Sequence, residues 1–209
     1  MARIVTNERD FKVPVGVDGV VERITPDNSA LTAAGHGRFY ELARIGNLFY
    51  AGNQAATATS ISVSTTHTGL LIYNPVGNSK TIVLEAVGLS MNLGDVALSS
   101  IALQGHYVST GAATTITTAC VLGTNMGPTR IGSSATPTAI ASFATTIVAP
   151  KLVMTLGGSA IATAVSGAGC IAFCDVGGAI QLEPGAYVAS YTLTALSCMF
   201  TFWWSEDPR

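Results

Sequence analysis

The chain has 209 residues, a formal net charge of −2 and 11% charged residues, against 48% hydrophobic ones. A typical soluble domain has roughly 25% charged residues. Such high hydrophobicity excludes intrinsic disorder, and the lack of basic excess argues against nucleic acid as a partner. The longest weakly polar stretch, residues 157–173, consists mostly of Gly, Ser, Ala and Thr. It lacks the large apolar residues of a membrane span, so we expect no membrane partner either.

The charges concentrate in the first quarter of the chain. Residues 1–50 contain twelve charged side chains, whereas residues 51–200 contain seven. The first segment is also rich in turn-forming residues, among them Pro14, Gly16, Gly19 and Pro26. We therefore predict two regions: residues 1–50 as an extended N-terminal arm or attachment segment, and residues 51–209 as the body.

Two roles for the arm remain open. It can cover the body of its own chain, or it can reach a neighbouring subunit. Within it, residues 38–44 are predicted to form a short helix that ends at Gly46, with Phe39, Leu42 and Ala43 on one face. The first residues are charged where a secretory signal would be apolar, so we expect synthesis in a cytoplasm without export.

The body shows the two-residue periodicity of β-strands. Residues 74–79 form a run of turn residues, and Val83 and Val87 are expected to share a strand face with Glu85. Residues 123–149 resemble a loop with a possible short helix at 139–143, and the pairs at 157–158 and 177–178 are predicted to be hairpin turns. The predicted strands are 60–64, 69–73, 80–87, 100–108, 114–122, 151–156, 170–173, 179–182, 187–194 and 199–204.

The number and spacing of these strands predict an all-β fold, a single jelly-roll-like antiparallel β-sandwich with the extended arm attached. The outward positions of the body are mostly Ser, Thr, Ala and Gly, where an isolated sandwich would have Lys and Glu. Burial against copies of the same chain, as in a homotrimer, explains this best. A hydroxyl-rich surface adapted to secretion is the alternative.

The cysteines and histidines do not form a recognisable site in the sequence. Of the four cysteines, Cys170 and Cys174 have a spacing compatible with zinc, but Cys120 and Cys198 are solitary. Buried free thiols are the favoured interpretation, with a disulfide or a metal site as alternatives. His36, His67 and His106 are isolated, and we expect His67 to be a surface residue in a loop. We predict no metal and no cofactor.

The sequence also lacks a catalytic signature. The carboxylates of the body, Glu85, Asp95, Asp175 and Glu183, lie far apart, and neither a nucleophile elbow nor a phosphate-binding glycine loop is present. We therefore expect no enzymatic activity. The C-terminal aromatic residues could form a sugar-stacking platform, but an alternating strand is more often core or subunit interface. We assign the interface to Phe200, Phe202, Trp203 and Trp204.

Several segments together resemble known proteins. They are residues 37–46 (GRFYELARIG), 69–75 (GLLIYNP), 77–80 (GNSK) leading into 82–84, 182–187 (LEPGAY) and 202–206 (FWWSE). This pattern resembles uncharacterised structural proteins of tailed bacteriophages and the jelly-roll decoration, or cement, proteins that form trimers on phage heads. Residues 77–79 depart from the pattern, where a more glycine-rich loop is expected.

The resemblance implies a non-enzymatic virion protein that stabilises a phage head as a homotrimer. Its partners would be copies of itself and the major capsid protein of the same virion, with virion localisation after synthesis in the host cytoplasm. The arm would attach to the capsid through Arg3, Arg9, Lys12 and Arg23. A fibre or receptor-binding module whose loops contact host glycans is the alternative.

Overall fold

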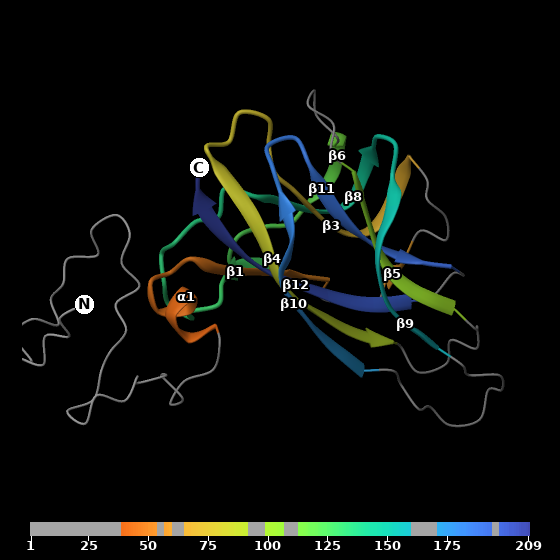
Figure 1. Ribbon diagram of the computed structural model, residues 1–209, viewed down its shortest axis with the longest axis horizontal. Helices are drawn as coiled ribbons and strands as arrows, with labels where there is room; N and C mark the ends of the chain where they lie inside the picture. Colours follow the sequence, from red (N-terminus) through yellow and green to blue (C-terminus); the bar gives the residue numbers. More distant parts are fainter. Residues whose placement is uncertain are drawn as a thin grey trace, which may run out of the picture. The chain divides into compact units, whose positions relative to one another are not determined.

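The computed structural model confirms an all-β sandwich (Figure 1). It describes residues 39–53, 57–59, 65–91, 99–106, 113–159, 171–193 and 197–209. Helix α1 spans Tyr40–Arg44. The strands are β1 Leu48–Gly52, β2 Thr57–Ala58, β3 Thr66–Tyr73, β4 Lys80–Met91, β5 Ser99–His106, β6 Ala113–Ala119, β7 Met126–Pro128, β8 Ile140–Ile147, β9 Lys151–Ser159, β10 Ile171–Leu182, β11 Tyr187–Thr192 and β12 Ser197–Pro208.

The strands form two antiparallel sheets. In the first, which we call the β12 sheet, the order is β10-β4-β12-β1-β7, and β2 also pairs with β12. In the second, the β11 sheet, the order is β6-β8-β3-β11-β5-β9. Figure 1 shows β12, in dark blue, beside β4 and β1, which come from the first half of the chain. Neighbouring strands are thus often distant in sequence, as in a jelly-roll-like sandwich.

The aromatic alternation of β12 builds the core between the sheets. Phe200, Phe202 and Trp204 are each at most 1% exposed, and the rings of Trp204 and Phe49 lie 6.0 Å apart. Burial of a large apolar side chain stabilises a fold by about 1.5–3 kcal/mol. Leu70 and Ile72 of the β11 sheet belong to the same buried cluster. The C-terminal strand therefore holds the two sheets together.

A bulge at Glu85 changes which residues of β4 face the core. The neighbouring residues Trp203 and Trp204 of β12 pair with Ala86 and Leu84 of β4, so Glu85 between them has no partner in this ladder and the register shifts. An extra residue reverses the alternation of side chains along a strand. Consequently Val87 joins Leu84 in the core. The expectation that Val83, Glu85 and Val87 share one face is wrong for this reason.

Four local predictions are also wrong. No helix forms at 139–143: residues 140–143 begin strand β8, where Ala141 pairs with Ile72 and is buried. The two predicted strands at 170–173 and 179–182 are not separate, because residues 171–182 form one long strand, β10. Gly177 and Gly178, with φ of 68° and 72°, lie at a register irregularity of that strand and not in a hairpin. The other glycine pair, 157–158, lies within β9.

The start of the body differs from the expected boundary at residue 51. Glu41–Arg209 forms one compact unit, and β1 pairs with both β12 and β7. The expected boundary therefore cuts through β1. The predicted short helix is present as α1, followed by Gly46 with φ of 77°. The predicted strand 60–64 and nearly all of the arm lie outside the described residues.

Candidate functional site

The structure separates the four C-terminal aromatic residues. Phe200, Phe202 and Trp204 are buried in the core of their own chain, so their side chains have no surface to offer a second subunit. Trp203 points to the opposite face of β12 and is half-buried. Of the four residues assigned to a subunit interface, Trp203 alone keeps a side chain that a partner can contact.

Trp203 belongs to an apolar patch on the outer face of the β12 sheet. The ring of Phe173, which is 59% exposed, meets that of Trp203 edge-to-face, with centroids 5.8 Å apart and planes at 72°. Tyr50 pairs with Trp203 in the sheet, and Met199 is 42% exposed. We call Tyr50, Phe173, Met199 and Trp203 the aromatic face.

Small residues make the surroundings of the aromatic face flat. Phe173 is opposite Gly88, which pairs in turn with Thr201, and Thr201 pairs with Gly52. Asp175, two residues along β10 from Phe173 and therefore on the same side, is exposed. A sheet face with aromatic rings, bare glycines and a hydroxyl is suited to contact with another surface, because little polar desolvation opposes it.

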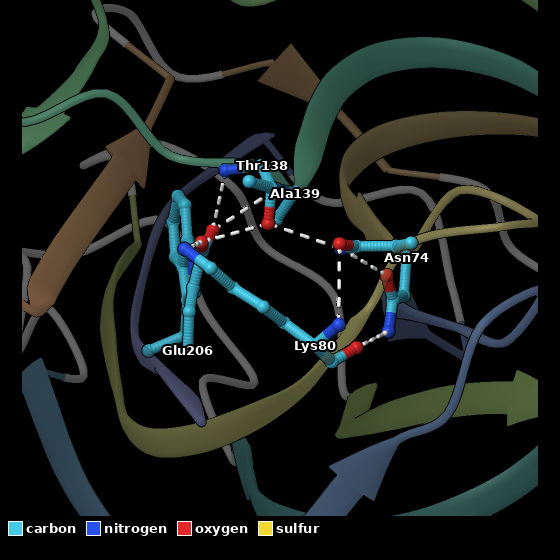
Figure 2. Close-up of polar contacts among 7 residues, drawn as sticks. Asn74, Lys80, Thr138, Ala139 and Glu206 are labelled. Atoms are coloured by element: carbon cyan, nitrogen blue, oxygen red, sulfur yellow. Dashed lines mark hydrogen bonds and ion pairs between the residues drawn. The ribbon is translucent and has the colours of Figure 1, made fainter. Parts of the chain in front are cut away.

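The most densely bonded carboxylate of the described residues is Glu206, which the sequence reading overlooked. Its side chain is 0% exposed, and Lys80 Nζ lies 2.9 Å from Oε2. As Figure 2 shows, Thr138 and Ala139 also converge on it: their backbone N–H groups donate to Oε1 at 2.7 and 3.0 Å, and the Thr138 hydroxyl donates to Oε2 at 2.7 Å. Trp204 Nε1 donates to Oε1 at 3.4 Å.

These contacts decide the protonation of Glu206. Burial by itself would raise the pKa of the carboxyl, but the donors from Ala139, Thr138 and Lys80 outweigh it and hold the pKa below its usual value. The buried carboxylate is thus held in its ionised form by donors of its own chain. Glu206 therefore ties the segment after β7 to β4 and β12.

Asn74 continues this network toward β10 (Figure 2). Its Nδ2 donates to the carbonyl oxygens of Lys80, at 2.9 Å, and Leu182, at 2.7 Å. Asn78 Nδ2 donates to Asn74 Oδ1 at 2.7 Å. The turn that precedes β4 is thus fixed to both β4 and β10, and the predicted turn residues serve a structural role.

His67 is buried, and the prediction of a surface histidine in a loop is wrong. It lies in β3 with 1% of its surface exposed. Burial lowers its pKa to about 4, although backbone groups of Leu70 and Gly69 oppose the shift. Gln104 Nε2 lies 3.0 Å from His67 Nδ1. The neutral ring can accept that hydrogen bond, so His67 is a polar member of the interior.

Four buried side-chain polar atoms of the β11 sheet, one of them in His67 itself, have no hydrogen-bond partner in the described structure. They are His67 Nε2, Gln104 Oε1, Ser190 Oγ and Thr192 Oγ1, from strands β3, β5 and β11. Strand β3 pairs with β11 through residues 71–73, and Gly69, two residues earlier in β3, has a φ of 122°. Buried polar atoms of this kind are places where ordered water is normally found.

The remaining predicted site residues do not come together. Cys120 and Cys198 are buried free thiols, and Cys174 is free and half-buried. Glu183 pairs with Arg209 at 3.1 Å, and Ser205 Oγ donates to Glu85 at 2.9 Å. Among the described residues, no group of three or more His, Cys, Asp or Glu could hold a metal ion, and no helix is long and apolar enough to cross a membrane. The arm residues Arg3, Arg9, Lys12 and Arg23, with His36, Asp95 and Cys170, lie outside the described residues.

Comparison of the chain with protein-family models, with curated proteins and with solved structures found no match.

Proposed function

We propose that the chain is a non-enzymatic structural subunit of a bacteriophage virion, a homotrimeric decoration protein that stabilises the head. The observation that carries the proposal is the aromatic face: a sheet surface of a charge-poor body that exposes Phe173 and Met199 to solvent beside the half-buried Trp203. Contiguous exposed apolar surface marks interaction sites. Burial of such surface against other subunits is the simplest use for it.

Two further features support a structural role. The polar groups with the most contacts, Glu206 and Asn74, are consumed by hydrogen bonds that brace turns and strands. The charges that could recognise a capsid concentrate instead in the arm. A stiff body for self-association and a charged arm for attachment are the two parts that a decoration protein needs.

The aromatic face also favours a second candidate function, a fibre or receptor-binding module. Aromatic rings present flat apolar surfaces, and the exposed Asp175 lies two residues from Phe173 on the same side of β10. A pyranose ring could stack on Phe173 or Trp203 while its hydroxyls hydrogen-bond to polar neighbours. Binding of purified glycans that is lost in a Phe173→Ala variant would favour this candidate.

The first test of the proposed function is the mass of the full chain in solution. Light scattering coupled to size-exclusion chromatography should give three times the 21.4 kDa chain mass at micromolar concentration and neutral pH. The Trp203→Ala variant should shift the mass toward the monomer, because it removes the ring that meets Phe173. Thr124→Ala, at an exposed position between β6 and β7, is the matched control and should stay trimeric. A wild-type monomer would contradict the proposal.

The second test concerns attachment. Replacing Arg3, Arg9, Lys12 and Arg23 together by Gln in the full chain should weaken binding to undecorated phage heads and leave the trimer intact. Binding should also weaken at high salt, because charge-assisted contacts between exposed groups are screened. Lys151→Gln, an exposed cation of the body, is the control and should bind normally. Equal binding by all three proteins would refute a role for the arm charges.

A further inference from the structure

Ile131 is the most exposed of the large apolar side chains in the described part of the chain. It is 99% exposed and occupies the tip of the turn after β7. The turn is tied down on both sides: Thr129 N–H donates to the Leu48 carbonyl at 2.9 Å, Arg130 Nη1 donates to the Arg44 carbonyl at 3.0 Å, and Ser133 N–H donates to the Arg130 carbonyl at 3.0 Å. The hydrogen-bonded turn therefore holds an isoleucine in solvent, where its apolar side chain contributes no burial to the stability of the fold.

A pocket of about 350 Å³ opens between the two sheets, beside β10 at the other edge of the β12 sheet. Its walls are mainly apolar, with Ile180 and Leu182 of β10, Val153 of β9 and Ala186 before β11. His106 and Glu183 add polar groups to the lining. Leu182 and Ala186 also belong to the buried core, so the pocket leads from solvent to the interior of the sandwich. Its size and lining suit an aliphatic side chain.

Ile131 cannot fill the pocket of its own chain. In the β12 sheet, β7 and β10 are the two end strands of the path β10-β4-β12-β1-β7. Four strand spacings of about 4.8 Å separate them by about 19 Å. An apolar knob at one edge and an apolar pocket at the other can meet only between two copies. Such a head-to-tail contact closes into a ring when the rotation between copies allows it.

The charges beside the two features are complementary. Arg130, which precedes Ile131, is exposed, and the side chain of Glu183 at the pocket is 44% exposed. Insertion of Ile131 into the pocket of a second copy would bring a guanidinium toward that carboxylate. Glu183 already pairs with Arg209 at 3.1 Å but retains lone pairs for a second donor.

We propose that Ile131 of one copy inserts into the pocket formed by Val153, Ile180, Leu182 and Ala186 of the next copy, and that this contact joins the copies head to tail. The inference rests on the proposed self-assembly and deepens it, because it names the two surfaces that meet. The occupant of the pocket is thus a second copy of this chain.

Two single substitutions in the full chain test the contact. Ile131→Asp removes the knob, and Val153→Asp, at a side chain that is 48% exposed, places a charge in the pocket. Each variant should raise the apparent dissociation constant of the oligomer roughly 30-fold or more, as loss of an interface hot spot does. Leu193→Asp, at a 55% exposed position after β11, is the matched control and should assemble as the wild type does. Circular dichroism verifies that every variant is folded.

Mixing the two defective variants makes the test specific for a head-to-tail contact. The I131D chain retains an intact pocket, and the V153D chain retains an intact Ile131. An equimolar mixture should therefore form one-to-one dimers by analytical ultracentrifugation at concentrations where each variant alone is monomeric. Failure of the mixture to dimerise would overturn the inference even if both single variants dissociate.

The other outcomes separate this inference from the proposed function. Wild-type mass retained by I131D would overturn the Ile131 contact while the proposed trimeric assembly stands. A monomeric wild-type chain would overturn both.

Discussion

Replacement of Glu206 by Gln should destabilise the fold more than any other single change of a carboxyl to an amide in the described residues. The side chain is 0% exposed and bonds to Lys80, Thr138, Ala139 and Trp204. The amide of an E206Q variant keeps one oxygen, which can still accept from Thr138 and Ala139. Its NH₂ group replaces the other oxygen and would face the ammonium of Lys80, so two donors would meet without an acceptor.

The expected magnitude follows from these contacts. Breaking a buried ion pair by removal of one partner costs about 3–5 kcal/mol. Lys80 is 33% exposed and can turn toward water, so the lower end of this range applies and we expect a loss of about 3 kcal/mol. A domain is stabilised by about 5–15 kcal/mol in total, so the loss is a large fraction of the stability.

Urea unfolding followed by circular dichroism measures this loss. Glu41→Gln is the control, because Glu41 forms an exposed pair with Arg44 at 2.8 Å with side chains 68% and 60% exposed. That substitution should change the free energy of unfolding by less than about 0.5 kcal/mol. An E206Q variant within about 1 kcal/mol of the wild type would refute the assignment of Glu206 as the central brace.

The pH dependence provides a second readout of the same group. The pKa of Glu206 is lowered in the folded chain, so its contribution is fully present above the unfolded value of 4.5 and is lost as the pH falls through the lower folded value. The wild type should therefore lose stability below about pH 4.5, and the E206Q variant should lose less over that interval. Parallel curves for the two proteins would count against the hydrogen-bond account of the pKa.

Two further predictions concern the interior of the sandwich. The pKa of His67 is lowered from 6.5 to about 4 in the folded chain, so as the pH falls the unfolded chain binds the proton first. The free energy of unfolding should therefore fall by up to about 3 kcal/mol between pH 6.5 and 4. A His67→Phe variant, unfolded in urea at several pH values, should lack this loss. Gly105→Ala should destabilise the chain by about 1–3 kcal/mol, because the new Cβ would lie 2.6 Å from the Tyr187 carbonyl oxygen. Gly88→Ala should leave the melting temperature almost unchanged, because the atom nearest to its new Cβ, in Thr201, is 3.6 Å away. Equal effects of the two alanines would refute the packing argument.

The sequence by itself determined the class of the fold. The alternation of Phe200, Phe202 and Trp204 with smaller residues predicts a strand with one buried face, and the structure buries all three. The Asn-Pro-Val-Gly-Asn-Ser run predicts the turn between β3 and β4. Helix α1 ends before Gly46 as expected, since a glycine adopts the positive φ that stops a helix. These features depend on periodicity and backbone preference, which are set by residues close together in the sequence.

The tertiary structure decided the features that depend on distant pairing. Residues 140–143 form a strand because Ala141 pairs with Ile72 of β3, and no local signal specifies that pairing. The bulge at Glu85 exists only in the register of β4 against β12, yet it decides which valine enters the core. His67 is buried although its neighbours are all threonine, since β3 lies inside a sheet.

The candidate sites show the same division. Glu206 lies in a charged C-terminal segment and has no motif, and its role arises when residues 138–139 fold back onto β12. Trp203 and Trp204 are adjacent in sequence, but the two faces of β12 send one to the outer surface and the other to the core. Composition could indicate a charge-poor body. The strand order places Ile131 beside β7, at one edge of the β12 sheet, and the pocket beside β10, at the other edge. Strand order is set by contacts between residues far apart in the chain, which is why the tertiary structure alone reveals it.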